Sequence, residues 1–239
     1  MSRRKRRYLT MLITVALLAV GRLDLRSQQF SVPKPKAPAA GFVGVQSRKA
    51  DELGVGKLLV ASRGLADPHF AKTVVLLVHY DAKGVVGLVL NRRTDIPLSH
   101  GFKAAKDRTD RVYFGGPVGA PRVFALFQSP AKIEGAEAVF GGVYLISDKT
   151  VFDQTISTQP DAGAFRVYLG CAGWEVEQLR REVELGSWFI FPADAKTVFS
   201  ASPDLMWEQM IRQTELSLAG NEAAGANPLT RTDALVAGY

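Results

Sequence analysis

Four short segments combine residue types that could carry out chemistry or bind a ligand. The first is Asp67-Pro68-His69, where a carboxylate stands two residues before an imidazole. Asp67 could orient His69 as a general base, or both side chains could contact a ligand. The structural alternative is that Asp67 caps the turn before Pro68, a common place for an aspartate. We favour the turn and keep both residues as candidate ligand-binding residues.

The second segment is Asn91-Arg92, which follows an apolar run of strand-forming residues. Binding groups often stand where a rigid strand gives way to a loop. The planar guanidinium of Arg92 could bind a carboxylate or phosphate through two parallel hydrogen bonds. Alternatively, Asn91 only turns the chain and Arg92 is solvated. The residues leave both interpretations open, so both side chains are candidates for ligand binding.

The third segment is Gly115-Gly116-Pro117, which permits a close backbone approach and then an extended chain. Neither the Gly-x-x-x-x-Gly-Lys-Ser/Thr nor the Gly-x-Gly-x-x-Gly spacing is present, so a phosphate loop is excluded. We favour a bend at a strand end, with Gly116 as a candidate backbone contact for a ligand.

The fourth segment, Gly170-Cys171-Ala172-Gly173-Trp174, is predicted to lie between a strand and a helix. A thiol at a helix N-terminus can have a lowered pKa and act as a nucleophile. His69, His79 or His100 could then serve as its base. We favour packing instead, because a lone cysteine among apolar residues is usually a small core residue. Trp174 would close the joint between helix and sheet and is a candidate ligand contact.

The sequence predicts no metal site and no cofactor. The chain has three histidines and one cysteine, without a His-x-x-x-His or Cys-x-x-Cys pair. We therefore assign no catalytic residue, and whether the protein is an enzyme stays uncertain, leaning towards no.

The elements that must position these segments centre on one hairpin. Residues 73–80 and 85–91 are continuous apolar runs, and Gly84 between them can adopt a positive φ. Strands that are apolar on both faces are covered on both sides. This hairpin is therefore predicted to form the centre of the core.

Strands outnumber helices in the rest of the chain and do not alternate with them regularly, which favours an α+β fold over a doubly wound sheet. Further strands are predicted at 57–62, 111–114, 122–128, 143–147, 166–170 and 188–191. Helices are predicted at 149–157, 175–185 and 203–212. In the helix at 175–185, Val176, Leu179 and Val183 share one face, and the acids between them, including Glu182, mark the solvated sides.

Charge and composition divide the chain into four parts. Residues 1–50 contain 11 lysines and arginines but only one acid, Asp24, whereas the remaining chain is slightly acidic. We predict a leader at 1–30, a linker at 31–52 rich in Pro, Lys and Ala, a domain at 53–215 and a flexible tail at 216–239. The basic charge belongs to the leader, so binding of nucleic acid by the folded domain is not expected.

The leader has the form of a secretory signal or a short membrane anchor. Residues 3–7 are basic, and 14 apolar or small residues follow before Arg22. A spanning helix needs about 20 such residues. We expect an exported or membrane-tethered protein; the alternative is a cytoplasmic protein with a mis-assigned start.

Four stretches, in order, carry a resemblance to a known family. They are Gly56–Ala61 with Leu65–Phe70, Thr73–Leu77 with Gly87–Arg92, Val112–Val118, and Gly170–Trp174 with Gln178, Trp188 and Pro192–Asp194. Together they resemble the YqgE/AlgH family of bacterial proteins over about residues 53–212. The family usually has an aromatic residue where Cys171 stands. The resemblance implies an α+β fold with a split, partly barrel-like mixed sheet flanked by helices, and a suggested role in transcriptional regulation.

Three functions follow as hypotheses. The first is a non-enzymatic binding or regulatory protein with an unknown protein partner or small ligand, presented at a membrane by the leader. The alternative is a hydrolase-like enzyme that uses Cys171 or the Asp67/His69 pair. Direct nucleic-acid binding would need Arg92, Arg93, Arg108 and Arg111 to gather on one face.

Overall fold

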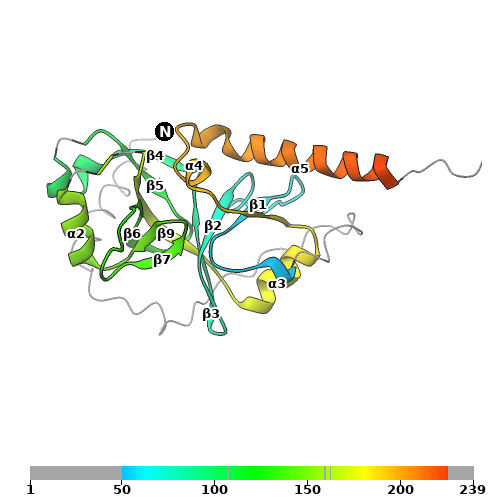
Figure 1. Cartoon of the computed structure of the whole chain (residues 1–239), viewed down its shortest axis with the longest axis horizontal. Coiled ribbons are helices and arrows are strands. Elements are labelled where there is room, and N and C mark those ends of the chain that lie inside the picture. Colours follow the sequence, from blue (N-terminus) through cyan, green and yellow to red (C-terminus); the bar gives the residue numbers. More distant parts are fainter. Residues whose placement is uncertain (1–49, 107, 159, 162, 226–239) are drawn as a thin grey trace, which may run out of the picture.

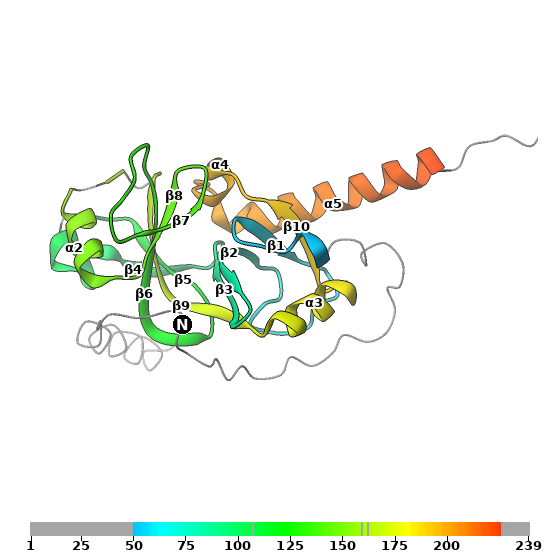
Figure 2. The same cartoon turned by 60° about the horizontal axis from the view of Figure 1, so that its bottom comes forward.

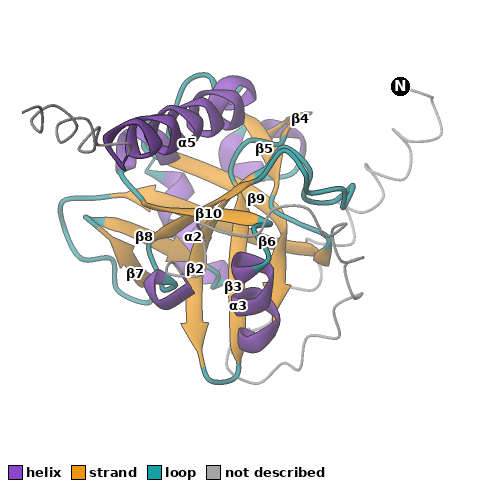
Figure 3. Cartoon of the chain, turned by 90° about the vertical axis from the view of Figure 1, so that its right-hand side faces the viewer, coloured by secondary structure: helices purple, strands orange, loops and turns teal. Residues whose placement is uncertain are grey.

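The computed structural model describes residues 50–225 except 107, 159 and 162, and its architecture is α+β as expected (Figure 1). The predicted leader, residues 31–49 of the predicted linker, and residues 226–239 lie outside the described residues. The expected partly barrel-like sheet is confirmed: ten strands form one curled sheet with helices around it (Figures 2 and 3). Among the described helices, none has the length and apolarity needed to cross a bilayer.

Eight strands follow one another across the sheet in the order β10-β1-β2-β3-β9-β6-β8-β7, while β4 pairs with β5, and β5 joins the sheet through β9. The β5–β9 pairing is parallel, and the other pairings are antiparallel. The strands are β1 Lys57–Ala61, β2 Val74–Asp81, β3 Gly84–Val89, β4 Arg93–Pro97, β5 Arg111–Phe114, β6 Val118–Gln128, β7 Glu137–Phe140, β8 Val143–Ile146, β9 Phe165–Trp174 and β10 Trp188–Pro192.

Four α-helices and three short 3-10 helices accompany the sheet in the described residues. The α-helices are α2 Lys149–Ser157, α3 Val176–Glu184, α4 Ala195–Val198 and α5 Pro203–Gly225. The 3-10 helices are η1 Ala50–Glu52, η2 Leu98–His100 and η3 Lys103–Ala105. Helix α2 begins where the Asp148 side chain accepts hydrogen bonds from the backbone N–H groups of Thr150 and Val151, which is a standard N-cap.

The predicted central hairpin is confirmed. All six residues of β3 and the first five of β2 are buried, so this pair is covered on both faces. The strands are joined through Asp81, whose side chain accepts a hydrogen bond from the Lys83 N–H, and Gly84 has φ 154°. Burial of such continuous apolar runs supplies about 25 cal/mol for each Å² removed from water, so the hairpin stabilises the fold strongly.

Strand β9 joins two halves of the molecule and corrects one prediction. Its first residues pair with β5 and β6, whereas its last residues, Ala172 to Trp174, pair with β3. The segment 170–174, which we predicted to lie between a strand and a helix, is therefore part of the strand. Gly170 adopts φ 70° within it, so the glycine bends the strand without ending it.

Two hydrophobic cores lie on either side of this junction. The larger contains the β2–β3 hairpin, Trp174 and Trp188, together with the start of α5. The smaller contains Phe152 and Ile156 from α2, packed against Phe165 and Val167 of β9. The split sheet implied by the family resemblance thus corresponds to two cores that share one long strand.

The sequence analysis missed strands β4 and β7 and helix α4, as well as the three 3-10 helices. Strand β4 is mostly polar and has no buried residue, and β7 and α4 are only four residues long. Strand β4 forms because it pairs with β5, and α4 begins where the Asp194 side chain accepts a hydrogen bond from the Thr197 N–H. None of these short segments carries a clear hydrophobic period, so pairing and capping decide their structure.

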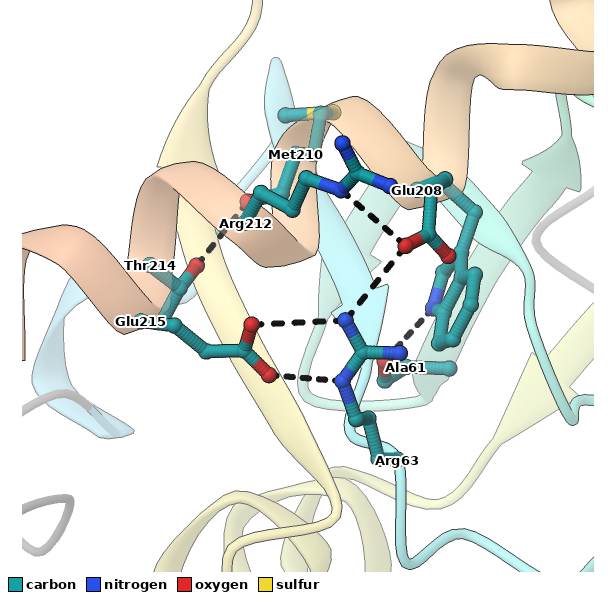
Figure 4. A network of polar contacts seen from close by, with 8 residues as sticks. Ala61, Arg63, Glu208, Met210, Arg212, Thr214 and Glu215 are labelled. Carbon is teal, nitrogen blue, oxygen red and sulfur yellow. Dashed lines mark hydrogen bonds and ion pairs between the residues drawn. The ribbon is translucent and has the colours of Figure 1, made fainter.

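Helix α5 is attached at its N-terminal half and projects from the body beyond it (Figures 1 and 2). Trp207 Nε1 donates a hydrogen bond of 2.7 Å to the Ala61 carbonyl at the end of β1. Arg63 pairs with both Glu208 and Glu215, between which its guanidinium lies (Figure 4). The helix continues past residue 212, where we predicted its end, and enters the predicted tail as far as Gly225.

The folded body also begins earlier than predicted. Residues 50–52, which we placed in the linker, form η1, and Ala50 is buried. Asp51 accepts a hydrogen bond of 2.8 Å from Arg180 of α3. Contacts to the body therefore start at least three residues before residue 53.

Candidate functional site

The predicted residues of the first two segments meet at one exposed loop, residues 67–72, between β1 and β2. Asp67 begins the loop: its side-chain Oδ1 accepts a hydrogen bond of 2.7 Å from the His69 backbone N–H. Its carbonyl accepts further bonds from the N–H groups of Phe70 and Ala71. Asp67 thus contacts the backbone of His69, as expected for a turn cap. The His69 imidazole is exposed and not oriented by this bond.

Asn91 closes the other end of the loop. Its Oδ1 accepts a hydrogen bond of 2.9 Å from the Val74 N–H, and its Nδ2 donates one of 2.9 Å to the Lys72 carbonyl. Lys72 has φ 58°, and it is the one described residue other than glycine with a positive φ. A lysine in this region is strained by roughly 1 kcal/mol or more, so surrounding contacts must hold it there. Asn91 supplies two of them.

Arg92 lies under the same loop. Its Nη2 donates hydrogen bonds of 3.1 Å to the Pro68 carbonyl and 3.4 Å to the Ala71 carbonyl. Burial lowers the pKa of the Arg92 guanidinium, and the nearby Asp67 carboxylate opposes that shift. Arg92 is therefore partly withdrawn from water and fixes the loop, in contrast with the solvated arginine of the structural alternative.

The inner side of the loop rests on aromatic rings. Phe70 stacks on Trp174 with ring centroids 5.3 Å apart and meets Trp188 edge-on at 5.7 Å. Trp174 and Trp188 are themselves in edge contact at 6.1 Å. Such pairs contribute about 0.5–1.5 kcal/mol beyond the area that they bury. Trp174 is almost fully buried, so it anchors the loop from below and does not itself face solvent.

Glu182 holds both indoles and was missed as a site residue. Its Oε2 accepts hydrogen bonds from Trp174 Nε1 at 3.2 Å and Trp188 Nε1 at 2.9 Å, and Oε1 accepts one from Gln178. We predicted a solvated Glu182, which is wrong because both indoles need an acceptor where they are buried. Burial raises the pKa of Glu182, and the three hydrogen bonds oppose the rise.

The glycine pair lies against β9 and has a structural role, as favoured. A Cβ added to Gly115 would stand 2.2 Å from the Gly170 carbonyl oxygen. One added to Gly116, whose φ is 152°, would stand 2.2 Å from the Cys171 carbonyl carbon. The backbone here approaches β9 more closely than any side chain allows. Gly116 is thus covered by β9.

Cys171 is fully buried inside β9, and burial raises the pKa of its thiol to about 11. The thiol is therefore protonated at neutral pH, which is the opposite of an activated nucleophile. Of the three histidines, His79 pairs with Asp81 at 3.2 Å, and His69 and His100 are exposed. His79 is partly buried near the end of the hairpin.

The arginines required for a nucleic-acid face are engaged within the protein. Arg93 pairs with Asp204 at 3.0 Å, and Arg108 pairs with Asp110 at 2.8 Å. Arg111 donates to the Asp95 carbonyl. In the described part of the chain, no group of three or more His, Cys, Asp or Glu side chains is arranged to hold a metal ion.

Comparison with known proteins places this chain in a family. A model of the AlgH-like family matches residues 58–219. A UPF0301 protein of Chlorobium limicola is 31% identical over 163 residues, which cover 68% of this chain and 87% of that protein. A UPF0301 protein of Burkholderia vietnamiensis is 33% identical over 175 residues, 68% of this chain and 89% of that one.

Two solved structures share the fold. The solution structure of the AlgH protein from Pseudomonas aeruginosa aligns with a TM-score of 0.54 and 27% identity, covering 74% of this chain and 95% of that chain. A crystal structure of a Corynebacterium diphtheriae protein aligns with a TM-score of 0.58 and 22% identity, covering 67% and 87%. The chain belongs to the AlgH-like family, whose members include the UPF0301 proteins.

Proposed function

We propose that this AlgH-like domain is a non-catalytic binding or regulatory module whose binding face is loop 67–72. One observation carries the proposal: the polar side chains of Asp67, Asn91 and Arg92 all hydrogen-bond to the backbone of this loop or of its end. They are used to hold its shape. A preorganised loop loses little conformational freedom when a partner binds, and so binds more tightly.

The outer side of the loop offers polar groups to a protein partner or small ligand. His69 is exposed, and the Asp67 carboxylate retains acceptor capacity beyond its bond to the His69 N–H. Lys72 adds a positive charge at the far end. A mixed polar surface on a fixed backbone is typical of recognition loops.

The hydrolase-like alternative has less support. It requires an activated Cys171 thiol or a His69 imidazole oriented by Asp67. The thiol is buried with a raised pKa, and the Asp67 carboxylate is bound to backbone. Direct binding of nucleic acid would need Arg93, Arg108 and Arg111, and these side chains have partners within the domain. We therefore propose that any role in transcriptional regulation is exerted through a protein partner.

Site-specific cross-linking tests the proposal. A photoreactive amino acid at position 69 in the full-length protein is expected to form a discrete adduct in cells. The matched control is position 132, where the side chain of Lys132 is 78% exposed in a different loop. Adducts of equal yield at both positions, or none at position 69, contradict a binding face at loop 67–72.

The leader forms a separate part of the proposal: residues 1–30 export the domain or tether it to a membrane. The support is the basic cluster followed by an apolar run. Fractionation of cells, with mass spectrometry of the mature N-terminus, tests it. A protein in the soluble cytoplasmic fraction that begins near residue 41 contradicts export and indicates a mis-assigned start.

A further inference from the structure

Arg166 is a buried cation without an acidic partner. It stands near the start of β9 and is 6% exposed. Its Nη1 donates a hydrogen bond of 2.8 Å to the Val198 carbonyl, and its Nη2 donates to the Ser200 carbonyl. No ion pair in the described residues involves Arg166. These carbonyls carry no net charge, so the positive charge is not neutralised.

Aromatic rings on two sides compensate the charge in part. The Arg166 guanidinium carbon lies 4.8 Å from the centroid of the Tyr113 ring and 6.0 Å from that of Phe199. Such contacts recover only part of the free energy that is lost when a charge is withdrawn from water. A guanidinium also has five N–H donors, more than its two hydrogen bonds to carbonyls require. The Arg166 guanidinium therefore has a positive charge and N–H donors available to a ligand.

Tyr168 provides a second donor beside Arg166. The two residues are i and i+2 on β9, so their side chains share one face of the strand. Tyr168 is completely buried. Its hydroxyl oxygen lies close enough to Arg166 to accept a hydrogen bond, but its proton has no acceptor among the described residues. Burial raises the pKa of Tyr168, and the Arg166 charge opposes the rise, so the hydroxyl remains protonated and can donate.

We propose that Arg166 and Tyr168 form a binding site for an oxyanion, the group shared by phosphates and carboxylates. An anionic oxygen would neutralise the buried guanidinium and accept the Tyr168 hydroxyl proton in a charge-assisted hydrogen bond. One anion would thus supply both the negative charge that Arg166 lacks and the acceptor that the Tyr168 hydroxyl proton lacks. The site is independent of loop 67–72, so it extends the proposed function.

The surroundings of the site fit an anion. Tyr113 is the register partner of Tyr168, with ring centroids 5.5 Å apart. Arg93 also acts on the Tyr113 hydroxyl, but its charge is offset by Asp204, which leaves Arg166 as the uncompensated charge of the region. The nearest acids are already neutralised: Asp204 by Arg93 at 3.0 Å, and Asp110 by Arg108 at 2.8 Å. The local balance thus favours a negative ligand.

The test uses thermal unfolding of the full-length protein in sodium phosphate, sodium acetate and sodium chloride at matched ionic strength. A ligand that binds only the folded state raises the midpoint with concentration. We expect phosphate or acetate to raise the midpoint above that in chloride. A response to phosphate alone assigns a phosphate group, and a response to acetate alone assigns a carboxylate. No difference from chloride in either salt overturns the proposal.

The Tyr168→Phe variant locates the effect. It keeps the ring and removes only the hydroxyl, whose proton has no acceptor among the described residues, so without ligand the variant should still fold. Its affinity for the responding anion is expected to fall about tenfold or more, the loss of one charge-assisted hydrogen bond. Tyr144→Phe on β8 is the matched control and should retain full affinity. Undiminished affinity in Tyr168→Phe overturns the proposal.

Arg166→Lys is the second variant, which keeps the charge and removes the planar fork. We expect the midpoint shift in phosphate or acetate to shrink, because a lysine donates from a single point. A shift as large as that of the natural protein means that the anion binds elsewhere. Because Tyr168→Phe preserves ring and volume, it decides the question even where Arg166→Lys is destabilised.

Discussion

Asn91 holds the end of loop 67–72, because its side chain satisfies one backbone group on each side of Thr73. Asn91→Ala leaves the Val74 N–H and the Lys72 carbonyl without their partner. Losing such bonds at a part-buried site costs about 1–3 kcal/mol in the free energy of unfolding.

Urea denaturation of the purified protein measures this cost. Asn91→Asp is the matched control, since it keeps the acceptor for Val74 and loses only the donor to Lys72. It should fall between the natural protein and Asn91→Ala. A free energy of unfolding unchanged in Asn91→Ala would show that the loop holds its shape without this side chain.

Glu182 gives a prediction with a defined sign in pH. Burial raises its pKa above the usual value of 4.5, so the folded state holds the proton more tightly than the unfolded state. The stabilising contribution of the protonated form is therefore present in acid and is lost as pH rises above 4.5 through the raised pKa. Glu182→Gln, which cannot titrate, removes this dependence.

The difference in free energy of unfolding between the natural protein and Glu182→Gln, measured by urea denaturation from pH 4 to pH 8, tests the sign. As pH rises, the free energy of unfolding of the natural protein should decrease relative to that of the variant. A difference that moves in the other direction would mean that the hydrogen bonds from Trp174 and Trp188 outweigh burial.

Cys171 should be unreactive in the folded protein. With a pKa raised to about 11, its thiol is almost entirely protonated at pH 7.5, and its burial blocks access. We expect iodoacetamide to modify it at less than about one hundredth of the rate seen in denaturant. Mass spectrometry of the alkylated protein over time gives the rate. Rapid modification under native conditions would revive the hydrolase-like alternative.

At the scale of elements, the close approach of the Gly115-Gly116 segment to β9 holds the two halves of the sheet together. Gly115→Ala would drive a Cβ to 2.2 Å from a backbone oxygen, and backbone cannot move aside as a flexible side chain can. We expect a cost of about 3 kcal/mol in the free energy of unfolding. Gly64→Ala, where nothing lies within 4 Å of the added Cβ, should be close to neutral. Equal effects of the two substitutions on thermal unfolding would refute this account of the junction.

The elements that could be predicted from sequence are those whose structure is determined by local features, such as an apolar run or a capping residue. The β2–β3 hairpin is built from continuous apolar runs, and α2 begins at an aspartate N-cap. The length of β9 could not be predicted, because Gly170 and Gly173 look like the end of a strand while β3 pairs with the segment beyond.

The same reasoning explains which site residues were found. Asp67, Asn91 and Arg92 stand beside strand ends and turn residues, where polar groups are conspicuous. Glu182 was assigned to solvent because a helical pattern only marks the apolar side, and the two indoles that need it come from distant segments. Arg166 and Tyr168 alternate with apolar residues on β9. This pattern is typical of a strand with one face in solvent, so it does not indicate that the two side chains are buried.

At the scale of the whole molecule, four separated sequence segments converge on one region. Loop 67–72 rests on Trp174 and Trp188, is held by Asn91 and Arg92, and stands beside the β3–β9 pairing. Three of the four stretches that carried the family resemblance supply these residues, and the stretch 112–118 packs on β9 instead. Their convergence indicates that this region maintains the shape of one exposed loop, more than a reactive group.

The cross-linking yield from position 69 in the Asn91→Ala background measures most directly whether binding depends on the shape of loop 67–72. Asn91 lies beneath the loop, and its removal should loosen the backbone while the rest of the domain stays folded. We expect the partner adduct to fall several-fold while circular dichroism and the thermal transition still report a folded protein. An undiminished adduct would contradict this expectation, since binding would then not depend on the shape that these side chains maintain.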